Sequence, residues 1–518
     1  MKLNYKRTIL VGFAFFLIMA FWQAYDATIP VILTNKFGMS QFWSGVIMAL
    51  DNVLALFMLP LFGTISDRSK SKWGKRTPFI VIGTVIAAVT LVALSVVDNM
   101  QLQKIQQYTA LDDVPTLERI YREQGTATLK TPEGEEFRLV DKFTQEEFVQ
   151  IKVNETDPAT GKMTATSAYT NYVAPAREAC VARVTAEDPS ALILFVSCLL
   201  VILIAMSTFR SPAVALMPDV TVKPLRSKAN AVINLMGTAG GIIVLVLGIV
   251  FATSAITHVF MSYSVYYAVI AGLMLFALVI FIFTVREPAW AKQMQEDTLR
   301  YGIEEETVQG STRKLSGGEK KSLILILLSV ALWYFGYNAV TSKYAVYATN
   351  ILDMNYNTTM LLAQGAAIVA YLPAGMIASK IGRKKTILAG VTVLALAFGI
   401  ASFMRAGSSV LLMNMLFASA GIGWATINVN SFPMAVELSS GSDVGKYTGY
   451  YYTASMAAQT ATPLISGYLM DHVADTVLFP YAAVFVSLAF VTMLFVTHGD
   501  SRIVEKKGLE AFDIEDQK

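Results

Sequence analysis

Charged side chains are scarce in this chain. Lysine, arginine, aspartate and glutamate make up 15% of its 518 residues, whereas soluble proteins carry roughly 25% charged residues. Hydrophobic residues make up 54% of the sequence. This composition excludes an ordinary soluble protein and predicts a protein that lies in a lipid bilayer.

Cysteine and histidine are rarer still. The sequence has two cysteines, and Cys180 and Cys198 do not have the spacing of metal ligands. We therefore expect no disulfide, no metal site and no cofactor. The net charge of +3 is small and the basic residues cluster in loops, which argues against nucleic acid as a partner. The stretch from Leu315 to Glu319 imitates the signature of an ATP-binding cassette, but the chain lacks a phosphate-binding loop, and we do not expect an enzyme.

Long apolar runs are plentiful by contrast. Twelve of them are close to the length of about 20 residues that crosses a bilayer. They span residues 8–33, 42–65, 78–97, 191–217, 229–252, 264–285, 322–349, 359–379, 385–404, 409–435, 447–470 and 479–497. We predict an all-α membrane protein with twelve transmembrane helices in two six-helix halves and a small extracytoplasmic insert.

The domain boundaries follow from these runs. The first half comprises residues 1–97 and 191–285, and the second half comprises residues 322–497. A linker of residues 286–321 joins the halves, and residues 498–518 form a tail. Lysine and arginine gather in the loops on the side of the linker, which predicts that both termini are cytoplasmic. We expect a monomeric, multi-pass protein of the plasma membrane, in the inner membrane of a bacterium.

Residues 98–190 interrupt the pattern between the third and fourth predicted helices. The segment is polar and contains strand-like pieces at Glu136–Val140 and Phe148–Val153. It reads as a small extracytoplasmic domain or a loosely ordered insertion. A solvated insertion without a role in transport is the plainer interpretation, and a lid or a partner-binding module is the functional one.

A dense basic hinge runs from Gly63 to Pro78 between two apolar runs, and a weaker form of it runs from Gly375 to Lys385. This repeat indicates two homologous halves, an arrangement typical of transporters. Glycines there permit close helix approach, and the charged side chains can pair across helix ends. We expect a gate on the cytoplasmic side, and the alternative is a simple positive-inside anchor. The predicted gate residues are Gly63, Asp67, Arg68, Arg76, Asp219, Arg226, Gly375, Arg383 and Glu437.

The pattern Gly-x-x-x-Asp-Arg followed by Trp-Gly-Lys-Arg-Thr-Pro in residues 63–78 resembles a loop of the major facilitator superfamily. The form is similar to that of glycoside-pentoside-hexuronide cation symporters and of sucrose/proton symporters. Further matches lie at residues 210–221, 225–237, 433–438 and 445–452. The resemblance covers all twelve predicted helices but not residues 98–190, and it implies a secondary transporter of a sugar.

The sequence departs from this family at two places. Melibiose-type members carry a pair of aspartates on the second helix for sodium coupling, and Ala55 and Leu59 occupy those positions here. Plant-type sucrose carriers have an arginine where this chain has Val214, while Arg210 lies one turn earlier. The resemblance therefore carries over neither sodium coupling at that site nor sucrose recognition residue for residue.

Four charged residues stand within apolar runs, where an unpaired charge costs about 3 kcal/mol or more. They are Asp26, Asp51, Arg210 and Lys343. We expect them to face a cavity or one another, and we predict that Asp26, Asp51 and Lys343 take part in coupling to a proton. The alternative is that Lys343 reaches the outer interface and that Asp51 caps a helix turn.

Polar and aromatic residues near the middle of the predicted helices form a candidate sugar site. Amides can hydrogen-bond sugar hydroxyls, and Trp or Tyr can stack on a pyranose ring. The predicted binding residues are Gln23, Arg210, Asn234, Tyr337, Asn338, Trp424, Asn428 and Gln459.

The sequence as a whole predicts a proton-coupled importer of a glycoside or another small sugar that works by alternating access. Its partners would be the sugar, the coupling cation and the lipid bilayer. A facilitator or exporter of another small polar solute is the second interpretation. A membrane sensor that does not transport is the third, and fold alone does not separate substrates.

Overall fold

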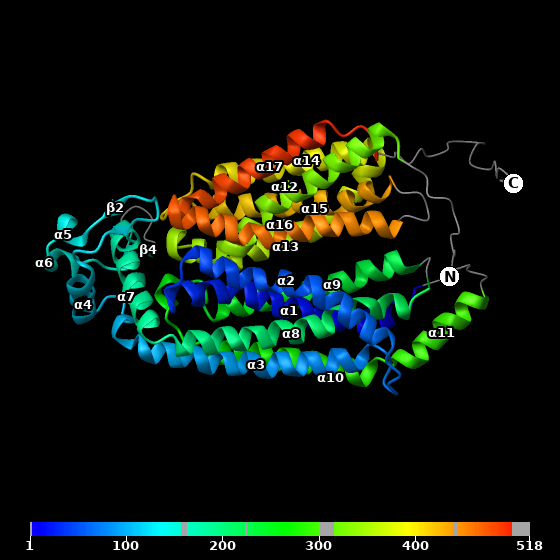
Figure 1. The fold of residues 1–518 in the computed structure, drawn as a ribbon, viewed down its shortest axis with the longest axis horizontal. Helices are drawn as coiled ribbons and strands as arrows, with labels where there is room; N and C mark the ends of the chain where they lie inside the picture. The colour runs from blue at the N-terminus through cyan, green and yellow to red at the C-terminus, as the bar shows by residue number, and fades with distance from the viewer. Residues whose placement is uncertain (1–2, 157–162, 223–224, 301–314, 439–443, 500–518) are drawn as a thin grey trace.

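The computed structural model describes residues 3–156, 163–222, 225–300, 315–438 and 444–499. Two bundles of long helices lie side by side (Figure 1). The first contains α1 (Tyr5–Asn35), α2 (Gln41–Asp67), α3 (Thr77–Lys104), α8 (Ser190–Asp219), α9 (Arg226–Val250) and α10 (Ser264–Thr284). The second contains α12 (Gly317–Tyr347), α13 (Tyr356–Ile381), α14 (Arg383–Ala401), α15 (Val410–Val436), α16 (Val444–His472) and α17 (Leu478–Leu494).

These helices confirm the predicted all-α fold of two six-helix halves. Within the described residues, ten helices are long and apolar enough to cross a membrane. The two halves repeat one packing scheme: α1 packs on α9 as α12 packs on α16, and α3 packs on α8 as α14 packs on α15. Each half has its own hydrophobic core.

The helices begin where the sequence supplies caps. The side chains of Asn4, Ser40 and Asn355 accept hydrogen bonds from backbone N–H groups in the first turns of α1, α2 and α13. Ser316 and Glu319 form a capping box at the start of α12. Such caps satisfy backbone donors that have no partner within the helix.

Residues beyond α3 form a small domain at one end of the molecule, here called the insert. It contains α4 (Val114–Gln124), α5 (Leu139–Lys142), α6 (Gln145–Phe148) and α7 (Ala174–Glu187). Two short antiparallel hairpins pair β1 (Leu129–Lys130) with β2 (Glu136–Phe137) and β3 (Asn154–Thr156) with β4 (Met163–Ala165). The insert has a core of its own, which includes Leu117, Phe148 and Cys180.

Three details correct the sequence predictions. The strand predicted at Glu136–Val140 is present only at its first two residues, and the strand predicted at Phe148–Val153 is wrong. Thr144 and Glu147 form a capping box there, which starts α6 instead. Helix α3 also runs past the predicted boundary at residue 97, because the polar residues that follow find partners in the first half.

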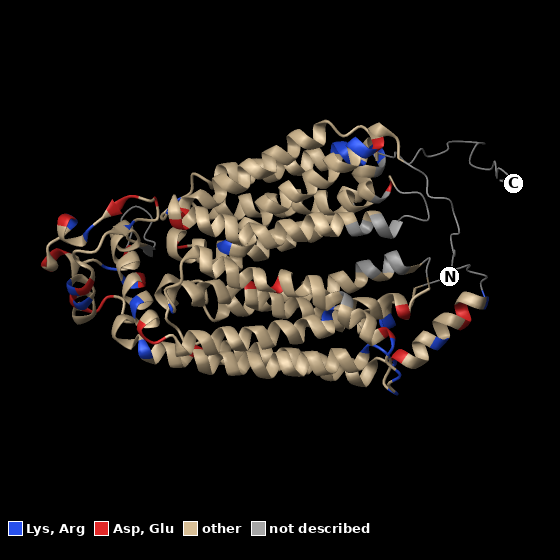
Figure 2. Ribbon diagram, in the orientation of Figure 1, with Lys and Arg blue, Asp and Glu red and all other residues tan. Residues whose placement is uncertain are grey.

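The insert and the chain termini lie at opposite ends of the long axis (Figure 1). We call these the insert end and the terminal end. The predicted linker contains a further helix, α11 (Glu287–Arg300), which also lies at the terminal end. Lysine, arginine, aspartate and glutamate concentrate at the two ends, and few of them lie along the middle of the helices (Figure 2).

Candidate functional site

A polar cavity of about 240 Å³ lies between the two halves. Asp26 of α1, Asp51 of α2 and Arg210 of α8 line it from the first half. Asn338 of α12 and Gln459 of α16 line it from the second half. The structure therefore brings together three of the four charged residues that the apolar runs contain, as a charge in a membrane helix requires.

The walls of this cavity also carry donors that find no partner within the protein. The indole N–H of Trp22, the hydroxyl of Tyr25 and the amide nitrogen of Asn338 are buried and have no hydrogen-bond partner among the described residues. The Arg210 guanidinium lies 5.7 Å from the Trp22 ring centroid. Unpaired buried donors are costly, so this wall is suited to a ligand rich in hydroxyl groups.

An adjoining cavity of about 220 Å³ lies toward the second half and shares Met19 and Thr341 with the first. Tyr337 and Trp424 line it, and their rings stack at 3.7 Å with an angle of 2°. Gln364 lines the same cavity and donates to Gln23 at 2.5 Å. The second cavity thus offers an aromatic wall beside amide groups, the combination that binds sugar rings.

Three predicted binding residues, Gln23, Asn234 and Asn428, do not line either cavity. Asn234 of α9 is exposed, and Asn428 of α15 is half-buried. Gln23 is buried and bonds Gln364 and the Tyr356 hydroxyl, so it supports the cavity wall. The lining residues that the sequence analysis missed include Trp22, Tyr25, Asn52, Thr341, Ser342, Gln364 and Tyr371.

Lys343 lies apart from the two cavities, toward the insert end. Its side chain is fully buried, and Nζ donates to the backbone oxygen of Gln41 in the first half. The carboxylate of Asp471, in α16, accepts hydrogen bonds from the backbone N–H groups of Gln41 and Phe42 at 2.7 and 2.8 Å. Lys343 therefore belongs to a set of contacts that join the two halves toward the insert end, here called the closure. The sequence analysis grouped it with Asp26 and Asp51 instead.

Close backbone packing completes this closure. A Cβ on Gly45 would lie 2.2 Å from the backbone oxygen of Pro463, and a Cβ on Gly467 would lie 2.4 Å from that of Gln41. Side chains at these positions would force α2 and α16 apart. The amide groups of Asn35 and Asn350 also bond each other across the halves.

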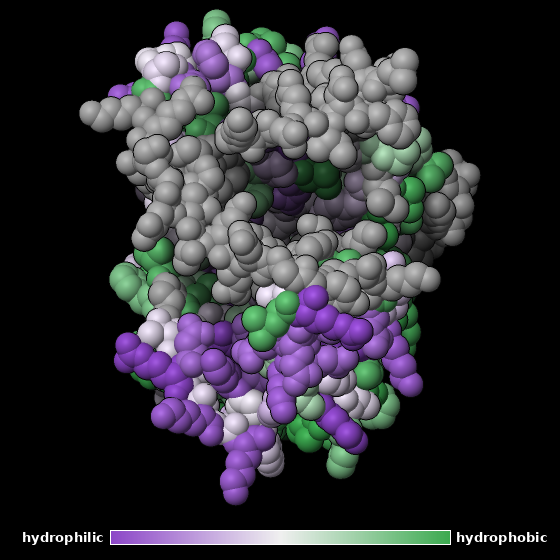
Figure 3. Space-filling view, turned by 90° about the vertical axis from the view of Figure 1, so that its right-hand side faces the viewer, coloured by the Kyte–Doolittle hydropathy of each residue, from purple (hydrophilic) through white to green (hydrophobic). Residues whose placement is uncertain are grey.

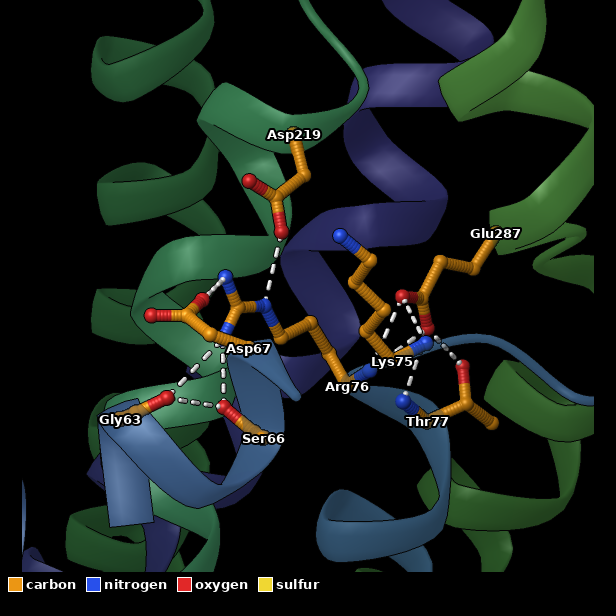
Figure 4. A network of polar contacts seen from close by, with 8 residues as sticks. All are labelled: Gly63, Ser66, Asp67, Lys75, Arg76, Thr77, Asp219 and Glu287. Carbon is orange, nitrogen blue, oxygen red and sulfur yellow. Dashed lines mark hydrogen bonds and ion pairs between the residues drawn. The ribbon is translucent and has the colours of Figure 1, made fainter. Parts of the chain in front are cut away.

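The terminal end is hollowed between the two bundles (Figure 3). The predicted gate residues lie at this end, and their ion pairs connect helices within each half. Arg76 is buried and donates through Nε to Asp219 at 2.7 Å, while its other nitrogens donate to Asp67 and Ser66 (Figure 4). Burial opposes the charge, but the hydrogen bonds and charges of Asp219 and Asp67 outweigh it and raise the pKa of Arg76.

The remaining gate predictions have varied outcomes. Arg383 and Glu437 pair at 2.9 Å in the second half, at the place equivalent to the Arg76 cluster. Gly63 allows close packing, since a Cβ there would lie 2.9 Å from Ser211 Oγ, and a Cβ on Gly375 would make an ordinary contact. Arg68 is exposed. The side chain of Arg226 lies outside the described part of the chain.

The sequence analysis missed Glu287, which holds the other side of this network. Its buried carboxylate accepts hydrogen bonds from the backbone N–H groups of Lys75, Arg76 and Thr77 and from the Thr77 hydroxyl, at 2.6 to 3.1 Å (Figure 4). The carboxylate thereby caps the N-terminus of α3, where the helix dipole favours a negative charge. It also fixes the start of α11 to the first half.

A second missed group is a buried ion pair near the insert end. Lys36 Nζ lies 2.7 Å from both carboxylate oxygens of Asp98 and donates to the backbone oxygen of Met261 at 2.7 Å. Both side chains are fully buried. The pair ties the α1–α2 loop to α3 and to the loop before α10.

Comparison with protein families supports two assignments along the chain. Residues 326–513 match the model of the Major Facilitator Superfamily, and residues 10–105 match the model described as MFS/sugar transport protein. The sucrose transport protein SUC4 of Arabidopsis thaliana is 37% identical over 60 residues. That alignment spans 12% of this chain and 12% of the plant protein.

Solved structures share the fold. The inward-open xylose transporter XylE from E. coli matches with a TM-score of 0.57 and 15% identity, over 98% of this chain and 100% of that chain. A D-xylose-proton symporter matches with a TM-score of 0.56 and 14% identity, over 96% and 99%. An inward-facing bacterial homologue of ferroportin matches with a TM-score of 0.60 and 12% identity, over 96% and 100%. At these identities the likeness concerns the fold alone.

Proposed function

We propose that this chain, which belongs to the major facilitator superfamily, carries a small sugar across a membrane together with a proton. The two halves would alternate between a state open at the terminal end and a state open at the insert end. The observation that carries this proposal is the charged cavity between the halves, lined by Asp26, Asp51 and Arg210 and joined to the aromatic cavity.

The charges of this cavity support coupling to a proton. With all three side chains ionised, two carboxylates and one guanidinium leave one net negative charge in a low-dielectric site. A single proton makes the cavity neutral, which lowers the cost of enclosing it. Asp26 is the proposed proton carrier, with Asp51 as the alternate. Ala55 and Leu59 replace the aspartates that bind sodium in melibiose-type relatives, so a proton is the proposed coupling ion.

The lining residues support a sugar as the substrate. Asn338, Gln459 and Arg210 can donate to hydroxyl oxygens, and the Tyr25 and Trp22 donors face the same cavity without partners in the protein. The stacked Tyr337 and Trp424 rings would bind the apolar face of a pyranose ring. The sugar-transport model that matches residues 10–105 agrees with this choice.

Counterflow of labelled sugars in proteoliposomes tests the proposal. Purified protein is first screened with a panel of mono- and disaccharides for those that raise its melting temperature. Each hit is loaded inside the vesicles, and exchange with external labelled sugar is followed. A transporter exchanges the sugar, whereas a sensor would bind it without exchange. Uphill accumulation driven by a proton gradient then separates a symporter from a facilitator.

A further inference from the structure

The insert is built as part of the first half. Its core includes Ile256 and Val259, which belong to the loop between α9 and α10. Gly38, with φ +64°, lets the α1–α2 loop approach α7 so closely that a Cβ would lie 2.4 Å from the backbone nitrogen of Ala182. Gln101 donates to Thr185 at 3.0 Å. The insert should therefore move with the first half as one body.

The insert nevertheless reaches three loops of the second half. In the α12–α13 loop, the carboxylate of Asp353 accepts from the backbone N–H of Ala165 at 2.8 Å. In the α14–α15 loop, Arg405 pairs with Glu133 at 3.2 Å. Next to the start of α17, the backbone N–H of Thr476 donates to Pro132 O at 3.3 Å.

The tip of the β1–β2 hairpin makes the tightest of these contacts. Its turn is ordered by hydrogen bonds from Gly134 N to Thr131 O at 2.8 Å and from Thr131 N to Glu135 O at 2.9 Å. Gly134 has φ +88°, and a Cβ there would lie 2.1 Å from the backbone oxygen of Val473. Only a glycine allows the tip to lie this close to the second half.

We propose that the insert is a clamp that holds the two halves together at the insert end, and that transport requires its contacts with the second half to break in each cycle. This inference rests on the proposed alternating access between the halves. Contacts of one rigid body with three loops of another add to the Lys343 and Asp471 closure. They stabilise the state in which the insert end is closed, and they oppose its opening.

Reversible cross-linking tests the clamp. Glu133→Cys and Arg405→Cys place a thiol on each side of the contact, in a background with Cys198→Ala. A short bifunctional methanethiosulfonate bridges them, and a reductant removes the bridge. The matched control is Arg138→Cys with Asp141→Cys, which replaces an exposed ion pair of 2.8 Å inside the insert.

The clamp predicts that the bridge between insert and second half lowers sugar counterflow at least tenfold, and that the reductant restores it. The control bridge should leave most of the counterflow. Equal counterflow in the two bridged proteins would show that the insert stays attached while the protein works, and would overturn the proposal. Counterflow before bridging reports separately on the proposed function.

A labelling experiment tests the clamp without any transport. Thr34 is buried and lines a cavity of about 160 Å³ between the insert and the two halves, so Thr34→Cys reports on opening at the insert end. Gly134→Ala should speed its labelling by an impermeant maleimide at least fivefold. Gly407→Ala is the matched control, since Gly407 has φ +81° and open space around the Cβ position. Equal labelling rates in the two variants would contradict the clamp.

Discussion

Replacing Lys36 with methionine should destabilise the protein far more than replacing Lys36 and Asp98 together. In Lys36→Met, the Asp98 carboxylate stays buried and loses two hydrogen bonds of 2.7 Å. Its remaining described partner is the backbone N–H of Tyr263 at 3.4 Å. In the double variant Lys36→Met with Asp98→Leu, no charge is left behind.

The magnitude follows from the burial of the pair. Removing one partner of a buried ion pair costs about 3–5 kcal/mol, and both side chains here have 0% exposure, which favours the upper part of that range. Replacing both partners with apolar residues is often close to neutral. The backbone oxygen of Met261 loses its 2.7 Å bond to Lys36 in either case, which costs about 1–3 kcal/mol. This loss is common to both variants and cancels, so we expect the double variant to be about 4 kcal/mol more stable than Lys36→Met.

The free energy of unfolding can be measured in mixed micelles with a rising fraction of denaturing detergent. Lys104→Met is the control, because its partner Asp188 is exposed and the variant should unfold like the unmodified protein. The single variant Asp98→Leu completes the set. The reasoning would be refuted if the effects of Lys36→Met and Asp98→Leu on the free energy of unfolding added up to the effect of the double variant. A near-neutral Lys36→Met would refute it as well.

Three further predictions concern the cavity, the gate and the insert. Arg210→Lys should impair counterflow nearly as much as Arg210→Ala, because lysine lacks the planar array of donors. A normal apparent affinity and maximal rate of counterflow in Arg210→Ala would show that Arg210 does not bind the substrate. Glu287→Ala should destabilise the protein by about 2–3 kcal/mol in the same micelle assay, and Glu287→Gln by less, because glutamine keeps one acceptor for the N-terminus of α3. Burial and the charge of Asp475 raise the pKa of Glu178 to about 8, so the folded protein holds a proton there that the unfolded chain loses near pH 4.5. The unmodified protein should therefore lose stability as the pH rises through this window. The melting temperature of Glu178→Gln should exceed that of the unmodified protein more at pH 9 than at pH 5, and a constant difference would contradict the assignment.

The helices and the charged cavity could be predicted because the free-energy costs behind them follow from the residue types alone. An apolar run of about 20 residues has few stable places outside a bilayer, and a charge within such a run must face a cavity or a partner. These rules identified Asp26, Asp51 and Arg210 as cavity residues. The stacking residues Tyr337 and Trp424 were also named, although nothing in the sequence indicated that their rings would meet.

The missed residues have partners that lie far away along the chain. The sequence analysis did not single out Lys36, because its partner Asp98 is 62 residues away and lies in the segment interpreted as the start of the insertion. Glu287 read as part of a polar linker, although its partners start a helix 210 to 212 residues earlier. Asn234 and Asn428 line neither cavity. Sequence position gives the depth of a residue in a helix and does not fix the side to which it points.

Uptake driven by a proton gradient tests the central claim most directly. Vesicles containing the protein, made acidic outside relative to the inside, are given the labelled sugar found in the counterflow screen. The account predicts accumulation above the external concentration, collapse of that accumulation by a protonophore, and exchange without accumulation in Asp26→Asn. Accumulation that depends on sodium and does not respond to the proton gradient would contradict it.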